Sequence, residues 1–240
     1  MRACGLTDIG AVRESNQDSF AVSISGAQPV WAVVCDGMGG ANGGYFASST
    51  AVGIFSHCLD INFEGLKPKQ IENVICEAVY SANSSLYKTS CEQSGLEGMG
   101  TTLVASLVCD ETAYVVNVGD SRAYHIVDNS ISQITTDHSV VQQLVSLGQI
   151  TKEEANGHPD KNMITRAVGV KDEVDADFFS VKLKKKSVIL LCTDGLTNFV
   201  SDEEILKTVS GENPEEEMKQ LVNLALSRGG SDNITVVIIG

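Results

Sequence analysis

The chain has 240 residues, of which 42% are hydrophobic and 20% charged, and its formal net charge is −14 at pH 7. This composition is typical of a soluble globular protein. It argues against nucleic acid as a main partner, because nucleic-acid binding needs a basic face. It also argues against a membrane protein, because no apolar run approaches the roughly 18 residues of a membrane span.

The seven cysteines are scattered, without Cys-x-x-Cys spacing. Cys35, Cys109 and Cys192 lie inside apolar runs, where a reduced thiol behaves as a small hydrophobe. This favours a reducing compartment over a disulfide framework or a zinc site. The N-terminus also lacks the apolar core of a signal peptide. A cytoplasmic location is therefore predicted.

The first half of the chain begins with strand-like runs near residues 19–25 and 30–35. Two helices should follow, because apolar residues recur at helical spacing. The two stripes are Ala47, Ala51, Ile54, Phe55 and Cys58, and then Ile71, Val74, Ile75, Ala78, Val79, Ala82 and Leu86. Residues 101–108, 112–118 and 121–128 are then expected to form an antiparallel meander.

The segment from Asp137 to Gly169 departs from this regular pattern. It contains a short apolar stripe near Val140 that should end at Gly148, and a capping box that starts at Thr151. A polar loop with His158-Pro159 follows. Such an irregular stretch inside a domain is often a functional flap.

The last third returns to strands at 175–183, 187–193 and 234–239. Between the last two strands, helices are expected after the capping box at Ser201 and from Pro214 to Gly229. Helices grouped between antiparallel strands indicate an α+β fold. About ten strands exceed one twisted sheet, so two packed sheets with helices outside are expected. No linker or repeat divides the chain, which predicts one domain over residues 1–240.

Three aspartates stand at the tips of apolar runs. Asp36 and Asp194 follow such runs, and Asp232 precedes one. Most Asp-Gly pairs at strand ends are only turns, but three together, with Asp120 after a further apolar run, favour a site. If the last strand runs antiparallel to the other two, the three carboxylates meet at one end of a sheet. Crowded carboxylates need a cation, and oxygen ligands suit magnesium or manganese.

The polar segment 7–18 precedes the first predicted strand. Arg13 can offer a planar fork of donors to a phosphate. Asp18 adds another carboxylate at the start of a strand.

These motifs, taken in order, resemble the type 2C family of metal-dependent serine/threonine protein phosphatases, particularly its compact bacterial members. The resemblance covers essentially the whole chain. Its motifs are Thr7…Arg13…Asn16-Gln17-Asp18, Cys35-Asp36-Gly37-Met38-Gly39-Gly40, Gly100-Thr101-Thr102, Val118-Gly119-Asp120-Ser121-Arg122, Thr136-Asp137-His138-Ser139, His158-Pro159, Ile164-Thr165-Arg166-Ala167-Val168-Gly169, Thr193-Asp194-Gly195-Leu196 and Ser231-Asp232-Asn233-Ile234-Thr235.

The resemblance implies a four-layer α-β-β-α sandwich with two antiparallel sheets, and a centre of two manganese or magnesium ions. By motif position, Asp36 would bridge both ions and the Gly37 carbonyl would bind one of them. Asp194 and Asp232 would hold the other ion. Asp120 matches a third, weaker metal site of bacterial relatives.

The implied reaction is hydrolysis of phosphoserine and phosphothreonine in proteins by a water that bridges the two metal ions. Asp18 would orient metal-bound water or bind a metal directly, and Arg13 would hold the substrate phosphate. Two cations neutralise the anionic phosphate and lower the pKa of the water between them. Residues 137–169 match the flap beside the active site. The implied partners are phosphoproteins and a cognate serine/threonine kinase, and the solvated acidic surface favours a monomer.

Two positions depart from the family pattern. Met38 stands where animal members commonly have a histidine that is proposed to protonate the leaving group. His138, His158 and metal-bound water are alternative proton donors. Gln17 stands where many relatives have Glu, which would modestly weaken affinity for one metal.

Three other functions fit the sequence less well. An aspartate-nucleophile phosphatase needs an Asp-x-Asp pair, whereas Asp36 is followed by Gly37-Met38. A regulatory phosphatase of the same fold, acting on anti-sigma antagonists, often lacks the Arg13-type clamp and usually carries a sensor domain. A non-enzymatic binding module would have lost metal carboxylates, whereas Asp18, Asp36, Asp194 and Asp232 are all present.

Overall fold

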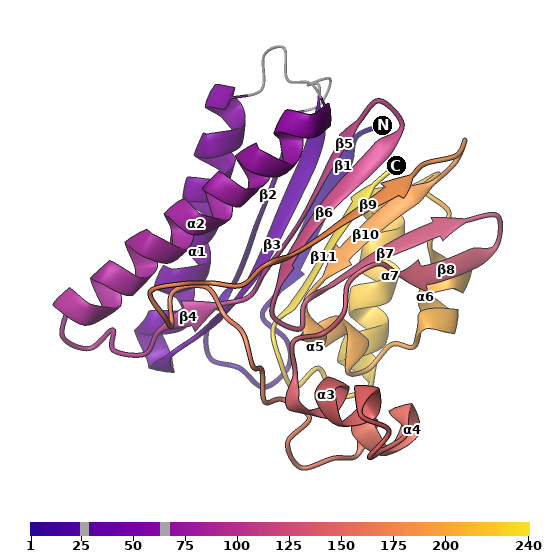
Figure 1. The fold of residues 1–240 in the computed structure, drawn as a ribbon. Coiled ribbons are helices and arrows are strands. Elements are labelled where there is room, and N and C mark those ends of the chain that lie inside the picture. Colours follow the sequence, from indigo (N-terminus) through magenta and orange to yellow (C-terminus); the bar gives the residue numbers. More distant parts are fainter. Residues whose placement is uncertain (25–28, 63–67) are drawn as a thin grey trace.

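Two antiparallel sheets, stacked face to face, form the middle of the computed structural model, which describes residues 1–24, 29–62 and 68–240. Helices cover the outer face of each sheet (Figure 1). On one side lie α1 (Gly40–Asn62) and α2 (Pro68–Glu92), and on the other α5 (Asp194–Thr197), α6 (Asp202–Thr208) and α7 (Pro214–Ser227). The α+β prediction of a four-layer sandwich is confirmed.

One sheet has five strands in the order β1-β11-β10-β7-β8. They are β1 (Ala3–Asp8), β7 (Arg122–Val127), β8 (Ser130–Gln133), β10 (Val188–Cys192) and β11 (Ile234–Ile239). Every neighbouring pair is antiparallel. The first and last strands are neighbours, and the backbones of Arg2 and Gly240 exchange hydrogen bonds of 2.7 and 3.1 Å.

The six-stranded sheet follows the order β2-β3-β5-β6-β9, with the short β4 paired to β3. Its members are β2 (Asp18–Val22), β3 (Val30–Met38), β4 (Gly100–Thr101), β5 (Leu103–Cys109), β6 (Thr112–Val118) and β9 (Asp177–Lys182). The predicted strand over 19–25 is β2, and its last residue lies outside the described part of the chain. The expected three-stranded meander over 101–128 was wrong for its last strand, because β6 and β7 belong to different sheets and the turn between them crosses from one sheet to the other.

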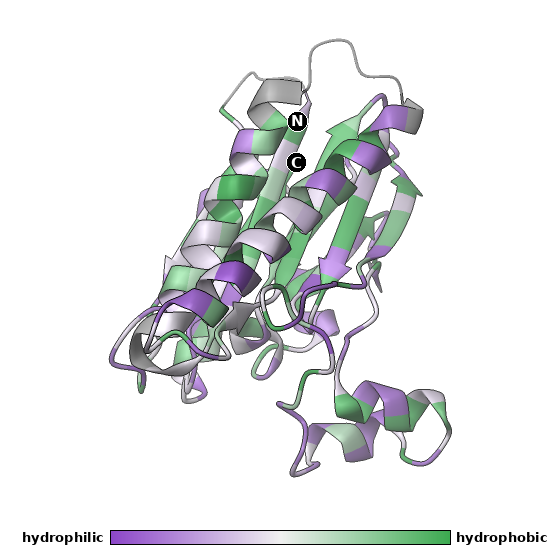
Figure 2. Cartoon of the chain, turned by 60° about the vertical axis from the view of Figure 1, so that its left-hand side comes forward, coloured by the Kyte–Doolittle hydropathy of each residue, from purple (hydrophilic) through white to green (hydrophobic). Residues whose placement is uncertain are grey.

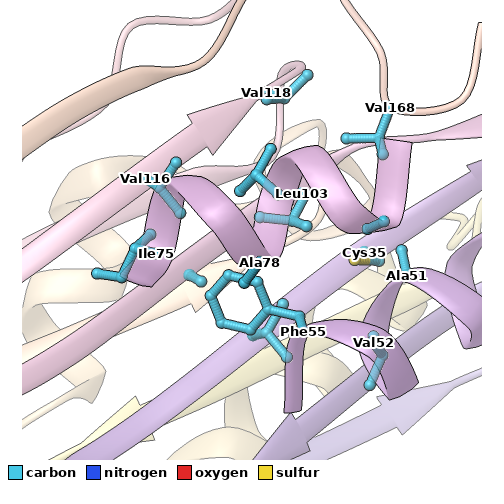
Figure 3. Packing of buried hydrophobic residues seen from close by; sticks show 14 of the residues in the cluster. Cys35, Ala51, Val52, Phe55, Ile75, Ala78, Leu103, Val116, Val118 and Val168 are labelled. Atoms are coloured by element: carbon cyan, nitrogen blue, oxygen red, sulfur yellow. The ribbon is translucent and has the colours of Figure 1, made fainter. Parts of the chain in front are cut away.

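The apolar run of β3 is buried on both faces, which is why it shows no polar alternation. Val30, Ala32 and Val34 face the other sheet. Trp31 and Cys35 face the helices α1 and α2. Figure 3 shows this helix-facing layer, in which Phe55 and Ala51 of α1 belong to the same buried cluster as Cys35 and Leu103 of the sheet. Both predicted helical stripes pack into it.

The sequence patterns missed three short elements: β1, β8 and α5. β1 is an edge strand with mostly half-buried residues, and β8 is four residues long with an exposed pattern. Strand patterns are weak where neither face is fully buried. α5 is a single turn directly after β10.

Between β8 and β9 the chain forms the flap, residues 137–169, with the helices α3 (Val140–Ser146) and α4 (Lys152–Asn156). Both helices project from one end of the sandwich, and hydrophilic and hydrophobic residues alternate along them (Figure 2). Both bonds of the predicted capping box at Thr151 are present, at 2.8 and 3.2 Å. Across the described residues, no helix combines the length and apolar character that a membrane crossing needs.

Candidate metal centre

Asp36 lies near the end of β3, where the chain leaves the sheet for α1. Thr102 accepts a hydrogen bond from the Asp36 backbone N–H at 2.9 Å. The Asp36 carbonyl accepts from the Thr102 N–H at 2.9 Å and from the Thr101 hydroxyl at 2.8 Å. These bonds fix the backbone on which the Asp36 carboxylate is mounted.

Asp18 stands opposite Asp36 in the antiparallel β2–β3 pair. Its side chain is 5% exposed and reaches across to the other sheet. There Asp18 Oδ2 accepts hydrogen bonds from the hydroxyls of Thr193 at 2.9 Å and Thr235 at 2.7 Å. Asp18 therefore links the two sheets through these two hydrogen bonds.

Asp194 and Asp232 come from the five-stranded sheet. Asp194 follows β10, and Asp232 precedes β11, which is antiparallel to β10. The expectation that three carboxylates meet at one end of a single sheet was wrong, because Asp36 belongs to the other sheet. The three meet at the shared end of two stacked sheets.

Asp120 lies in the turn between β6 and β7, where the chain passes from one sheet to the other. Ser121, its neighbour, shares a 2.8 Å hydrogen bond with the hydroxyl of Thr102. The turn is thereby joined to the residues that hold the Asp36 backbone.

A cavity of about 500 Å³ receives four carboxylates, those of Asp36, Asp120, Asp194 and Asp232. The cavity is also lined by Arg13, Gly37 and Met38, and by Ile164 from the flap. A second cavity of about 530 Å³ adjoins it, shares Asp120 and Asp194, and continues between the flap and the α5–α6 region.

Burial and the charges of neighbouring carboxylates raise the pKa of Asp18, Asp36, Asp120 and Asp194. Burial, followed by the charges of Asp18 and Asp194, raises the pKa of Asp36 well above its usual value. Burial raises the pKa of Asp18 to about 7, against hydrogen bonds from Thr235 and Thr193 that lower it. Burial, followed by the charge of Asp194, raises the pKa of Asp120 to about 8. Such a cluster stays ionised at neutral pH only when cations balance it.

Two buried carboxylate oxygens have no hydrogen-bond partner among the described residues and are available to a cation. Asp18 Oδ1 and Asp194 Oδ1 are buried and have no hydrogen-bond partner. Within the described ranges, no three His, Cys, Asp or Glu side chains converge closely enough to form a metal site alone. Magnesium commonly completes its shell with water, and carbonyl oxygens also bind hard cations. The residues present fit ions of this kind.

The backbone at Gly37 packs closely against Gly44 at the start of α1. A Cβ on Gly37 would lie 2.0 Å from the Gly44 carbonyl oxygen, and a Cβ on Gly44 would lie 2.8 Å from the Gly37 carbonyl oxygen. Only two glycines allow this approach of strand and helix. The sequence singled out Gly37, and the structure adds Gly44.

Arg13 lies at the rim of the cavity, with half of its side chain exposed. Its Nη2 donates to Asp232 Oδ2 at 2.8 Å. A metal ion that binds Asp232 Oδ2 would compete with the Arg13 guanidinium for this oxygen. When a cation takes that oxygen, Arg13 is free to meet another anion at the rim.

The departures from the family pattern also lie in this region. Met38 lines the cavity, and the amide of Gln17 donates to the Gly40 carbonyl at 2.8 Å. Gln17 thus supports the start of α1.

The two histidines proposed as proton donors do not line either cavity. His138 is 6% exposed, its Nδ1 accepts from the Gly119 N–H at 3.1 Å, and its Nε2 lies 3.1 Å from Asp177. His158 Nδ1 accepts from the Asp160 N–H within its own turn. His138 instead holds the base of the flap against the turn that carries Asp120.

Sequence reasoning missed the polar residues that support the carboxylates: Thr102, Thr193 and Thr235. A signal for Thr193 and Thr235 was available, because each is a polar residue in or beside a buried strand. Such residues are buried only with hydrogen-bond partners. The sequence could not identify those partners.

Comparison with known proteins supplies an independent result. The family model described as protein phosphatase 2C matches residues 11–226. The chain is similar to the serine/threonine phosphatase stp of Listeria welshimeri, with 37% identity over 242 residues, covering 100% of this chain and 95% of that protein. Its fold is similar to the crystal structure of serine/threonine phosphatase Stp1 from Staphylococcus aureus, with a TM-score of 0.92, 37% identity and coverage of 98% and 93%. It is also similar to the catalytic domain of the serine/threonine protein phosphatase PstP in complex with two manganese ions, with a TM-score of 0.84, 34% identity and coverage of 99% and 96%.

Proposed function

The chain belongs to the protein phosphatase 2C family, and we propose that it removes phosphate from phosphoserine and phosphothreonine side chains of proteins at its carboxylate-lined cavity. One observation carries the proposal: four aspartates from two sheets converge on one cavity whose rim bears Arg13. The relative of similar fold that binds two manganese ions supports the choice of cofactor.

Two manganese or magnesium ions, when bound, would supply charge neutralisation for the phosphate and a water of lowered pKa to attack it. Asp36 would hold both ions, with the Gly37 carbonyl on one and Asp194 and Asp232 on the other. Asp120 would hold a third, weaker ion.

The chain's own residues prepare the reaction around these ions. Asp18, held by Thr193 and Thr235, would orient a water molecule at the back of the centre. Arg13 would bind and orient the phosphoryl oxygens, because its guanidinium presents parallel N–H donors. The proton donor to the leaving oxygen is a water molecule in this proposal, since no histidine lines the cavity among the described residues.

The proposed partners are phosphoproteins and the serine/threonine kinase that modifies them. The protein would act as a monomer in a reducing cytoplasm, a location supported by seven cysteines that are all present as thiols. The net charge of −14 supports protein rather than nucleic acid as the substrate.

The test is phosphate release from a phosphothreonine peptide by the purified chain. Release should require added manganese or magnesium and should stop on exhaustive chelation. Asp36→Asn and Asp232→Asn should each lower the rate by about 100-fold or more, because each removes a carboxylate that balances the cations. Activity that survives chelation or either substitution would overturn the metal mechanism.

A further inference from the structure

Asn233 is the residue that fixes the loop bearing Arg13. This loop, Ile9–Gln17, joins β1 to β2 without regular secondary structure. The Asn233 side chain amide donates to the carbonyls of Ile9 at 2.9 Å and Ser15 at 3.0 Å. Its oxygen accepts from the Gln17 N–H at 2.9 Å. One side chain therefore satisfies three backbone groups at the two ends of the loop.

The loop has few apolar contacts to hold it. Ile9 and Val12 are 40% and 66% exposed, and residues 11–15 are all exposed. The Ala11 N–H adds one hydrogen bond to the Gly230 carbonyl. Asn233, in contrast, is 4% exposed, so its amide group is shielded from competing water. The position of the loop thus depends mainly on polar contacts, and Asn233 makes most of those that reach the segment directly before β11.

Asn233 also stands next to Asp232, the partner of the Arg13 guanidinium. Two adjacent residues thus contact this loop: Asp232 accepts from the Arg13 guanidinium, and Asn233 holds the backbone at the two ends of the loop that carries Arg13. A cation that takes Asp232 Oδ2 removes the first contact and leaves the second. The loop would then keep Arg13 at the cavity rim through Asn233.

We infer that Asn233 is a positioning residue: it holds the loop so that the Arg13 guanidinium lies where it can bind the substrate phosphate. Asn233 affects substrate binding only through Arg13. The inference rests on the proposed function, in which Arg13 binds that phosphate. Preorganising a flexible binding loop removes an entropic cost of binding.

A double-mutant cycle tests this with manganese-loaded enzyme and a phosphothreonine peptide. Asn233→Ala should raise KM, and the inhibition constant of inorganic phosphate, about tenfold. In an Arg13→Ala background the same change should alter both by less than about twofold, because the group it positions is gone. Hydrogen exchange of a peptide spanning residues 9–17 should be faster in Asn233→Ala, independently of activity.

Asn83→Ala is the matched control. Asn83 is 2% exposed and also makes three bonds to backbone groups, donating to the Lys171 and Asp172 carbonyls and accepting from the Gly169 N–H. It should lower Tm comparably without accelerating exchange at residues 9–17, and its effects should multiply with those of Arg13→Ala.

The outcomes separate the inference from the proposed function. The positioning role of Asn233 is wrong if Arg13→Ala raises KM and Asn233→Ala then raises it further by its full factor in the double mutant. It is also wrong if Asn233→Ala lowers Tm without raising KM. In both cases the phosphatase proposal stands. If Arg13→Ala leaves KM and phosphate inhibition unchanged, both the phosphate role of Arg13 and the positioning role fall. If catalysis itself is absent, the proposed function fails, and exchange at residues 9–17 still reports whether Asn233 holds the loop.

Discussion

Asp18 and Asp36 stand directly opposite each other across the antiparallel pair β2–β3. Two carboxylates placed side by side repel, so the fold brings like charges together at a cost in stability. Thr193 and Thr235 hold Asp18 from the other sheet and thereby keep the pair aligned. The carboxylate cluster is therefore an electrostatically unfavourable arrangement that bound cations would relieve.

The stability of the metal-free protein should fall as pH rises from about 4 to about 8. Burial raises the pKa of Asp18 to about 7 and of Asp120 to about 8, above the value of about 3.9 for an unfolded aspartate. The folded state therefore binds more protons, so this contribution is present below pH 4 and is lost as pH rises through 7 and 8.

Calorimetry in chelator across this range measures the slope of Tm. Asp120→Asn should flatten it, and added Mg²⁺ should raise Tm most at the alkaline end. A Tm that is independent of pH in both the wild type and Asp120→Asn would contradict the raised pKa of Asp18 and Asp120 in the folded protein.

Replacing Thr235 with Val should displace Asp18. The change leaves the carboxylate without the 2.7 Å hydroxyl donor and costs about 1–3 kcal/mol of stability. Affinity for manganese, measured by calorimetric titration, should weaken about tenfold, as for other outer partners of metal centres. Thr235→Ser keeps the hydroxyl and should retain most of the affinity. Equal losses in Val and Ser variants would show that the methyl packing matters and the hydrogen bond does not.

Gly37→Ala should disrupt the centre because its new Cβ would lie 2.0 Å from the Gly44 carbonyl oxygen. Backbone must move to relieve this contact, and a loss of about 3 kcal/mol or more in the free energy of unfolding is expected, as for severe overpacking. Gly53→Ala is the control, because nothing lies within 4 Å of its Cβ in the exposed part of α1. That change should stabilise by up to about 1 kcal/mol through helix propensity. Denaturant unfolding compares the two, and a neutral Gly37→Ala would refute the close approach.

Glu217→Gln should destabilise the contact between α7 and the turn that precedes it at Ser210 and Gly211. The Glu217 carboxylate is 6% exposed and accepts from Ser210 N–H at 3.1 Å and Gly211 N–H at 3.0 Å. Hydrogen bonds from Ser210 and Gly211 lower its pKa against desolvation, which acts in the opposite direction. Its stabilisation should thus be present above the unfolded value of about 4.3 and lost as pH falls through the lower folded value.

Denaturant unfolding should show a loss of about 1–3 kcal/mol at pH 7 that shrinks toward pH 3. Glu216→Gln, which removes an exposed carboxylate one position earlier, should change stability by less than about 0.5 kcal/mol. Equal effects of the two changes at pH 7 would rule out a specific role for Glu217.

The sequence predicted the elements that are buried on at least one face. The runs that became β3, β10 and β11 and the stripes of α1, α2 and α7 carry their burial pattern in their own residues. β1 and β8 could not be found in this way, because an edge strand is held by backbone pairing that leaves little trace in side-chain polarity. The capping boxes at Thr151 and Ser201 marked α4 and α6 because capping is local.

The candidate site was predicted by residue type and order, but its geometry was not. Asp36, Asp194 and Asp232 were expected in one sheet and instead come from two. His138 was an attractive proton donor by position, yet its hydrogen bonds to Gly119 and Asp177 occupy both ring nitrogens. Pairing between residues far apart in the chain decides such matters, and no local pattern encodes it.

By itself, the sequence determined which carboxylates terminate buried strands and which arginine precedes them, because strand ends and turns are local properties of the chain. Only the tertiary structure decided that Asp18 is held from the opposite sheet by Thr193 and Thr235, and that Asn233 closes the loop of Arg13. These contacts join residues more than 170 positions apart. They form because stacking the two sheets buries polar groups that must then find partners across the interface.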